Sequence, residues 1–221
     1  MKLINNLRRA VCFSALMGFG LAHAGSYEDF FSAIKEDNAS AVQALLVRGF
    51  DPNTLDPNGM IGLYIALAEP SLKVAQVLIA WPKTDVNKLN PKGESPLMMA
   101  AIKGYSELAR ELIDKDADIN KTGWTPLHYA ASTGQLPVIT LLLDNSAYID
   151  AESPNGTTPL MMAAMYGTPE AVKLLLQEGA DPQLKNQQGL SALDFSQRAQ
   201  RPDSMQALAA AIRSKRPLGQ W

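Results

Sequence analysis

The sequence predicts an all-α solenoid of about six helix–turn–helix units that follow one another along the chain. The motif Thr-Pro-Leu-His-Tyr-Ala-Ala, from Thr125 to Ala131, recurs in degenerate copies about every 33 residues. Each copy is followed by a second apolar stretch and a turn of small residues. A period of this length is typical of stacked repeats, in which each unit packs against its neighbours. Alignment on Pro126 gives equivalent positions 30 to 34 residues apart, at Asp29, Gly62, Pro96, Pro159 and Ala192.

The best copy explains why each unit should be a helix hairpin. Thr125 can accept hydrogen bonds from the free amides of a helix start, and Pro126 suits the first helical position. Leu127 shares one helical face with two alanines, whose short side chains let a second helix approach closely. Gly134 tolerates the positive φ that ends such a helix, and residues 138–143 supply the apolar stripe of the second helix.

The same pattern recurs in Ser95-Pro96-Leu97 with Ala100-Ala101, and in Thr158-Pro159-Leu160 with Ala163-Ala164. Turns such as Gly179-Ala180-Asp181 close the units. The chain thus resembles the ankyrin repeat, which implies L-shaped units with projecting hairpin fingers. The predicted array covers residues 25–213, in units of 26–56, 57–90, 91–121, 122–151, 152–185 and 186–213.

Departures from the pattern are expected at both ends and at one finger. The first and last units are the most degenerate, as exposed caps of a stack should be. Between the third and fourth units, Asn120 is followed directly by Lys121-Thr122-Gly123, three residues fewer than elsewhere. This finger should be short and should leave a notch in the row of fingertips.

The two termini are predicted to lie outside the array. Residues 1–24 combine a basic start, a 12-residue apolar run and Ala22-His23-Ala24, which together indicate a cleaved Sec-type signal peptide. An uncleaved anchor is the alternative, but the run is shorter than the roughly 20 residues needed to span a bilayer. We therefore expect a periplasmic protein without membrane insertion after cleavage, or alternatively a secreted one. Residues 214–221 read as a flexible basic tail, with a docking tail as the alternative.

Composition argues against catalysis and nucleic-acid binding. Cleavage would remove Cys12 and His23, so that the mature chain has no cysteine, and it would leave 17 basic against 22 acidic residues. We expect no catalytic residue, no metal and no cofactor. The remaining histidine, His128, is predicted to hold a helix start. The turn acids should serve local hydrogen bonds and not calcium ligation or paired-carboxylate catalysis; they are Asp51, Asp85, Asp118, Asp150 and Asp181.

The resemblance places binding on the fingertips, the exposed side of the first helices and the concave face. The candidate protein-binding residues flank the finger glycines or follow the alanine pairs: Met60, Glu69, Glu94, Ile102, Lys103, Trp124, Ser132, Thr133, Thr157, Met165 and Tyr166. Trp124, Met165 and Tyr166 form the apolar part, and aromatic anchors of this kind dominate many interfaces. The alternative role of these three side chains is to pack against the neighbouring repeat. Trp124 is the strongest candidate because a short finger would expose its ring.

The function predicted from these features is a non-enzymatic, monomeric protein-interaction module in the periplasm, with an unknown protein partner. Alternatives within this class are an immunity protein against a periplasmic toxin and a secreted effector. The resemblance to exported bacterial ankyrin-repeat proteins implies, as a further alternative, an accessory factor for a periplasmic enzyme such as a catalase. The rival class is an enzyme, for instance a hydrolase that uses His128 or the finger acids. It is disfavoured because few residues lie beyond the array.

Overall fold

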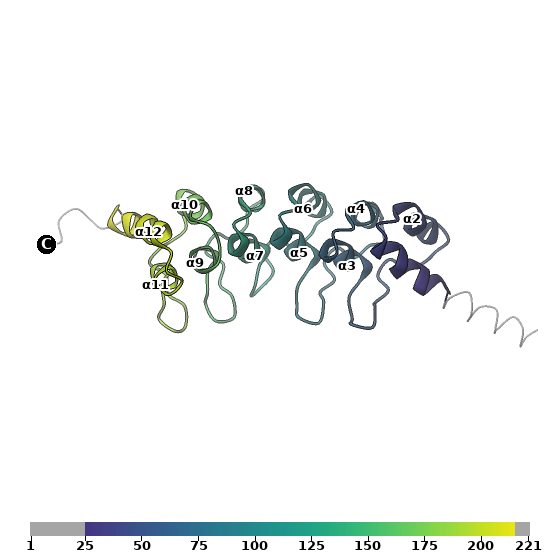
Figure 1. The fold of residues 1–221 in the computed structure, drawn as a ribbon, viewed down its shortest axis with the longest axis horizontal. Helices are drawn as coiled ribbons and strands as arrows, with labels where there is room; N and C mark the ends of the chain where they lie inside the picture. Colours follow the sequence, from purple (N-terminus) through teal and green to yellow (C-terminus); the bar gives the residue numbers. More distant parts are fainter. Residues whose placement is uncertain (1–24, 215–221) are drawn as a thin grey trace, which may run out of the picture. The chain divides into compact units, whose positions relative to one another are not determined.

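The computed structural model describes residues 25–214; the predicted leader, 1–24, and residues 215–221 of the predicted tail lie outside them. The chain divides into two compact units, Met1–Thr84 and Asp85–Trp221. Both units consist of helix hairpins, which confirms the predicted fold class (Figure 1). The division falls within the predicted second repeat, between its helices and the finger that follows them.

The first unit holds two hairpins. A helix over residues 25–35 pairs with α2 (Ala39–Val47), and α3 (Gly62–Ala68) pairs with α4 (Leu72–Ala80). The first helix already includes Gly25, four residues before Asp29, which the alignment matched with Pro126. Phe30 and Ile34 are nevertheless buried, like the residues aligned with them after Pro126, so only the helix start differs. Glu28 and Asp29 lack the Thr-Pro signal that marks a helix start elsewhere.

Gly62 takes the position that proline holds in other repeats, and the packing explains the substitution. A Cβ atom at this position would lie 2.7 Å from ring atoms of Phe30 and from Ile34. Phe30 in turn packs against Phe50, with ring centroids 4.6 Å apart. The large aromatic core of this unit therefore requires a helix start without a side chain.

The second unit holds four hairpins whose helices form two layers, with the fingers projecting beyond the first helices (Figure 1). The first helices are α5 (Pro96–Lys103), α7 (Pro126–Thr133), α9 (Pro159–Met165) and α11 (Ala192–Arg198). The second helices are α6 (Ser106–Ile113), α8 (Leu136–Asp144), α10 (Pro169–Gln177) and α12 (Pro202–Ser214). All four first helices begin at the residue that the alignment predicted.

Alanine pairs bring the helices of the second unit close together. Both alanines of each pair in α5, α7 and α9 are fully buried, as is the leucine at the second helical position. α7 packs against α5 on one side and α9 on the other. Among residues 25–214, no helix is both long enough and apolar enough to cross a membrane.

Asparagine side chains join successive turns within the second unit. The Asn87 amide donates to Asp116 O at 2.9 Å, and its oxygen accepts from Asp118 N–H at 2.7 Å. Asn120 repeats both bonds to the next turn, at 2.9 Å to Ser146 O and 2.8 Å from Tyr148 N–H. These pairs hold the hairpins in register, because each asparagine satisfies a carbonyl and an amide of its neighbour.

The turn acids serve two different purposes. Asp85, Asp118 and Asp181 each accept the amide two residues later, at 2.9 to 3.1 Å, as the local reading predicted. The prediction that Asp150 makes the same local hydrogen bond is wrong. This residue occupies the asparagine position and accepts Asp181 N–H at 3.1 Å, while Tyr148 stands in the position of the turn acid.

Candidate protein-binding site

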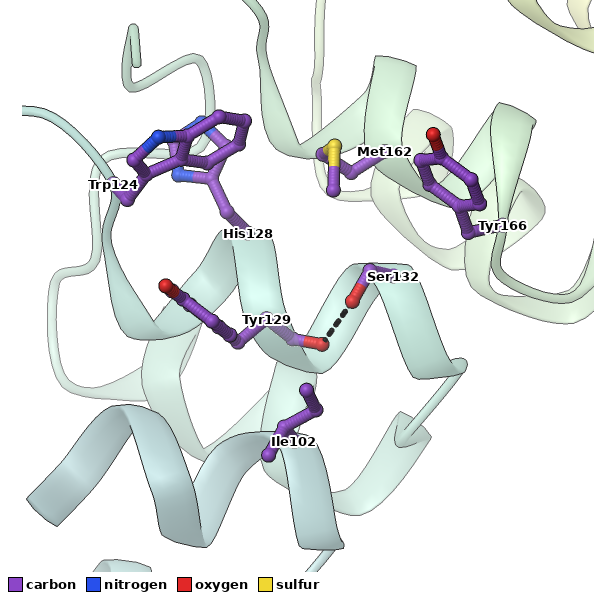
Figure 2. A pocket seen from close by; sticks show the side chains of 7 residues that line it. All are labelled: Ile102, Trp124, His128, Tyr129, Ser132, Met162 and Tyr166. Atoms are coloured by element: carbon purple, nitrogen blue, oxygen red, sulfur yellow. Dashed lines mark hydrogen bonds between the residues drawn. The ribbon is translucent and has the colours of Figure 1, made fainter. Parts of the chain in front are cut away.

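A pocket of about 260 Å³ opens on the exposed side of the first helices of the second unit (Figure 2). It draws residues from α5, α7 and α9 and from the finger that precedes α7. The lining is mostly aromatic or aliphatic and consists of Ile102, Trp124, His128, Tyr129, Ser132, Met162 and Tyr166. Three adjacent repeats therefore contribute to one site.

Trp124 forms one wall of the pocket at the base of the shortened finger. The finger before α7 is visibly shorter than those before α5 and α9, as the missing residues predicted (Figure 1). The indole ring is half-buried and stands edge-on to His128, with centroids 5.2 Å apart and an interplanar angle of 76°. The indole ring therefore packs against a side chain that is itself fully buried.

His128 is held by hydrogen bonds on both ring nitrogens. Its Nε2 lies 2.9 Å from Thr157 O, which can only accept, so Nε2 carries the proton. Nδ1 therefore accepts from Thr125 N–H at 3.2 Å and from the Thr125 hydroxyl at 2.9 Å. Burial lowers the pKa of His128 to about 4, against the opposing effect of the backbone bonds. A neutral histidine thus caps α7 and connects it to the next finger, in agreement with the predicted hydrogen-bonding role.

Other repeats solve the same capping problem with different side chains. The third helical position holds Met98 in α5 and Met161 in α9, whose sulfurs lie 3.3 and 3.4 Å from the amide of the residue that caps the helix. In α11 the same position holds Asp194, whose carboxylate accepts from the Ser191 amide at 2.7 Å. The third helical position therefore has a structural role throughout the unit, and His128 fulfils this role in α7.

Tyr129 and Ser132 form the wall contributed by α7. The Tyr129 hydroxyl donates to the Glu94 carboxylate at 3.2 Å, and the Ser132 hydroxyl donates to Tyr129 O at 2.8 Å (Figure 2). The pKa of Tyr129 is raised to about 12, mainly by burial and further by the charge of Glu94. The phenol is therefore protonated and uncharged at physiological pH.

The structure brings four of the predicted binding residues together in the pocket: Ile102, Trp124, Ser132 and Tyr166. Glu94 lies directly behind Tyr129. Lys103 and Thr133 are exposed but do not line the pocket, and Met165 is half-buried outside the lining. Met60 and Glu69 belong to the first unit, where they are half-buried and exposed.

Thr157 is a correction to the predicted set. It is only 3 % exposed, and its backbone carbonyl accepts the hydrogen bond from His128. Its amide is bonded to the Ser153 hydroxyl at 3.0 Å, within the finger. Thr157 therefore supports the site from behind and presents no surface to a partner.

Sequence reasoning missed Tyr129 and Met162, which line the pocket from the fourth position of α7 and α9. Tyr129 precedes the predicted Ser132 by three residues, so the two share one helical face. Extending the predicted surface by one helical turn toward each helix start would have found both residues. Among residues 25–214, no group of histidine, cysteine or acidic side chains is arranged to hold a metal ion.

Stacked hairpins with projecting fingers define this protein as a helical repeat protein. Within that class the chain belongs to the ankyrin-repeat family. The family model described as ankyrin repeats in three copies matches residues 63–153 and 146–216. Membership in this family makes the chain a protein–protein interaction module.

Two curated relatives match about half of this chain and a small part of their own length. Neurogenic locus notch homolog protein 2 of Homo sapiens is 33% identical over 123 residues, which cover 54% of this chain and 5% of that protein. Ankyrin repeat and SAM domain-containing protein 6 of Rattus norvegicus is 34% identical over 109 residues, 48% of this chain and 12% of the relative. The chain therefore spans a small fraction of these relatives.

A solved bacterial structure matches over a much larger share of both chains. It contains the predatory endopeptidase Bd0816 from Bdellovibrio bacteriovorus in complex with the immunity protein Bd3460. A chain of this complex superposes with a TM-score of 0.71 and 28% sequence identity, covering 82% of the present chain and 97% of its own length. The likeness thus extends to almost the entire length of the matching chain.

Proposed function

We propose that this protein is a non-enzymatic, monomeric binding module, exported to the periplasm, that recognises a partner protein through the pocket between α5, α7 and α9. The observation that carries the proposal is the largely aromatic pocket on the exposed side of these helices. Trp124 packs against His128 and the Tyr129 hydroxyl donates to Glu94, and such contacts reduce the side-chain freedom that is lost on binding. Partly exposed aromatic anchors in such a setting are typical interface hot spots.

Site-specific photo-crosslinking in the source organism tests this proposal. A benzoylphenylalanine probe at Lys103, which is exposed beside the pocket, should yield a discrete adduct with one protein. The same probe at Thr140, exposed on α8 in the layer of second helices, is the control and should yield none. Adding Trp124→Ala should abolish the Lys103 adduct in a protein that still shows a helical circular dichroism spectrum. Equal adducts at both positions, or none at Lys103, would count against the pocket.

A second candidate function is immunity against an exported peptidase. The solved endopeptidase–immunity protein complex supports it, because one of its chains matches this protein over most of both lengths. The test is inhibition of peptidases encoded next to this gene by the purified protein. Stoichiometric inhibition that Trp124→Ala weakens would support immunity, whereas capture of an uninhibited enzyme such as a catalase would indicate an accessory role.

Export rests on residues 1–24, whose basic start, apolar run and small-residue cleavage motif fit a Sec-type signal. Fractionation of cells, with mass spectrometry of the N-terminus, tests this part separately. We expect a periplasmic protein that begins at Gly25. Recovery from the culture medium would favour the secreted effector, and an uncleaved cytoplasmic protein would refute export.

A further inference from the structure

The pocket between α5, α7 and α9 is small. Its volume of about 260 Å³ lies below the range of about 300–1,000 Å³ that is usual for small-molecule sites. We propose that it receives the side chain of an arginine from an exposed loop of the protein partner. This inference rests on the proposed binding function and names the chemistry of the anchor.

Three polar residues of the lining already donate their side-chain hydrogens to hydrogen bonds within the protein. The Ser132 hydroxyl donates to Tyr129 O, the Tyr129 hydroxyl donates to Glu94, and His128 Nε2–H donates to Thr157 O. The indole nitrogen of Trp124 lies on the side of the ring away from Met162 and Tyr166 (Figure 2). These hydroxyl oxygens can still accept hydrogen bonds. A ligand rich in donors therefore suits the pocket better than a carboxylate or an amide oxygen.

Aromatic rings supply the second argument for a cation. Trp124, Tyr129 and Tyr166 come from three different segments and surround the opening (Figure 2). The faces of such rings carry negative electrostatic potential and attract guanidinium and ammonium groups. Tyr166 is 59 % exposed, so its ring is accessible to an approaching side chain.

Charge supplies the third argument. The Glu94 carboxylate accepts from the Tyr129 hydroxyl at 3.2 Å and so places a negative charge just behind the wall. The second unit, Asp85–Trp221, also carries 15 acidic against 13 basic residues. Two cations also lie nearby: Lys103 is exposed beside the pocket, and the Arg201 guanidinium donates to Tyr166 O at 3.2 Å. Glu94 is therefore the group at the pocket wall that would attract a basic side chain. Arginine fits better than lysine because its planar head stacks on aromatic rings and its alkyl stem can pack along Met162 and Ile102.

The experiment compares three probes of similar size on the full-length chain. N-acetyl-arginine methylamide carries the charge, its citrulline analogue keeps the shape without the charge, and N-acetyl-norleucine methylamide is apolar. The indole NMR signal of Trp124, assigned with Trp124→Phe, reports binding. We expect a saturable shift with the arginine probe and dissociation constants about tenfold higher for the other two.

Glu94→Gln tests whether the charge of Glu94 itself, and not the overall charge of the protein, attracts the arginine probe. It should weaken the arginine probe several-fold while the amide oxygen still accepts from Tyr129. Glu107→Gln, on the exposed surface of α6, removes the same charge away from the pocket and should have no effect. Unchanged thermal midpoints confirm that both variants fold.

Three results would overturn the inference: norleucine binding as tightly as arginine, no saturable shift with arginine, or equal losses in the two glutamine variants. These results leave the proposed function standing if the Lys103 probe still yields its adduct. Absence of that adduct, in contrast, refutes the function itself.

Discussion

The buried histidine at the start of α7 should make the protein less stable in mild acid. His128 is fully buried, and its pKa is lowered to about 4 from an ordinary value of 6.5. Between these two values the unfolded chain binds a proton that the folded chain excludes. The free energy of unfolding therefore falls as the pH is lowered through 6.5, and the loss levels off below about 4.

The size of the effect follows from the two pKa values. The full difference corresponds to about 3 kcal/mol, and about 2 kcal/mol of it should be lost between pH 7 and pH 5. Urea unfolding at pH 5, 6, 7 and 8, followed by circular dichroism, measures this loss. His128→Met is the matched control, because Met98 and Met161 hold the same position in the flanking helices with sulfurs facing the capping amides.

The difference between the two proteins isolates His128, since the other titrating groups are common to both. We expect the wild type to lose about 2 kcal/mol more than His128→Met between pH 7 and pH 5. Parallel stability profiles would refute the reasoning, because they would mean that the folded protein accommodates a charged imidazole. A larger loss in the variant would refute it equally.

Two further predictions concern the repeat scaffold. Asp150→Asn should raise the free energy of unfolding by about 1 kcal/mol. The new amide can donate to Gly179 O, just as the amides of Asn87 and Asn120 donate to the next turn. Unchanged urea midpoints would contradict this prediction. Gly134→Ala should cost about 1 kcal/mol more than Gly104→Ala. Both glycines have positive φ, but a Cβ at Gly134 would lie 2.5 Å from Thr168, whereas the contact at Gly104 is the movable end of a side chain. Equal thermal midpoints for these two variants would contradict the second prediction.

Helix starts could be predicted from the sequence because capping is local chemistry. A Ser or Thr followed by Pro fixes the first turn whatever lies around it, and α5, α7 and α9 begin at the predicted proline. The helix over residues 25–35 lacks this signal, and it already includes Gly25, four residues before the aligned position Asp29. The role of Asp150 was missed for a related reason. One acid per repeat looks like one conserved turn, although Tyr148 holds the acid position there.

The site was only partly predictable because it depends on contacts between repeats. Trp124 and Tyr166 were found from their places in the repeat, and Ile102 and Ser132 join them in the pocket. That Thr157 faces inward follows from its carbonyl bond to His128, 29 residues away, which no local pattern reveals. Within this finger, Pro154 and Asn155 are exposed whereas Thr157 is buried, and no local sequence pattern distinguishes the exposed from the buried positions.

The pocket exists where three departures from the repeat coincide. The residue before the helix cap is Trp124 in α7, but Glu94 before α5 and Leu190 before α11. The finger before α7 is short, and the half-buried ring of Trp124 stands edge-on to the buried His128 (Figure 1). A methionine in its place could cap the helix but would offer a flexible chain as the support. The regular repeats thus provide the frame, and the irregular repeat at α7 provides most of the pocket through which we propose that the protein binds its partner.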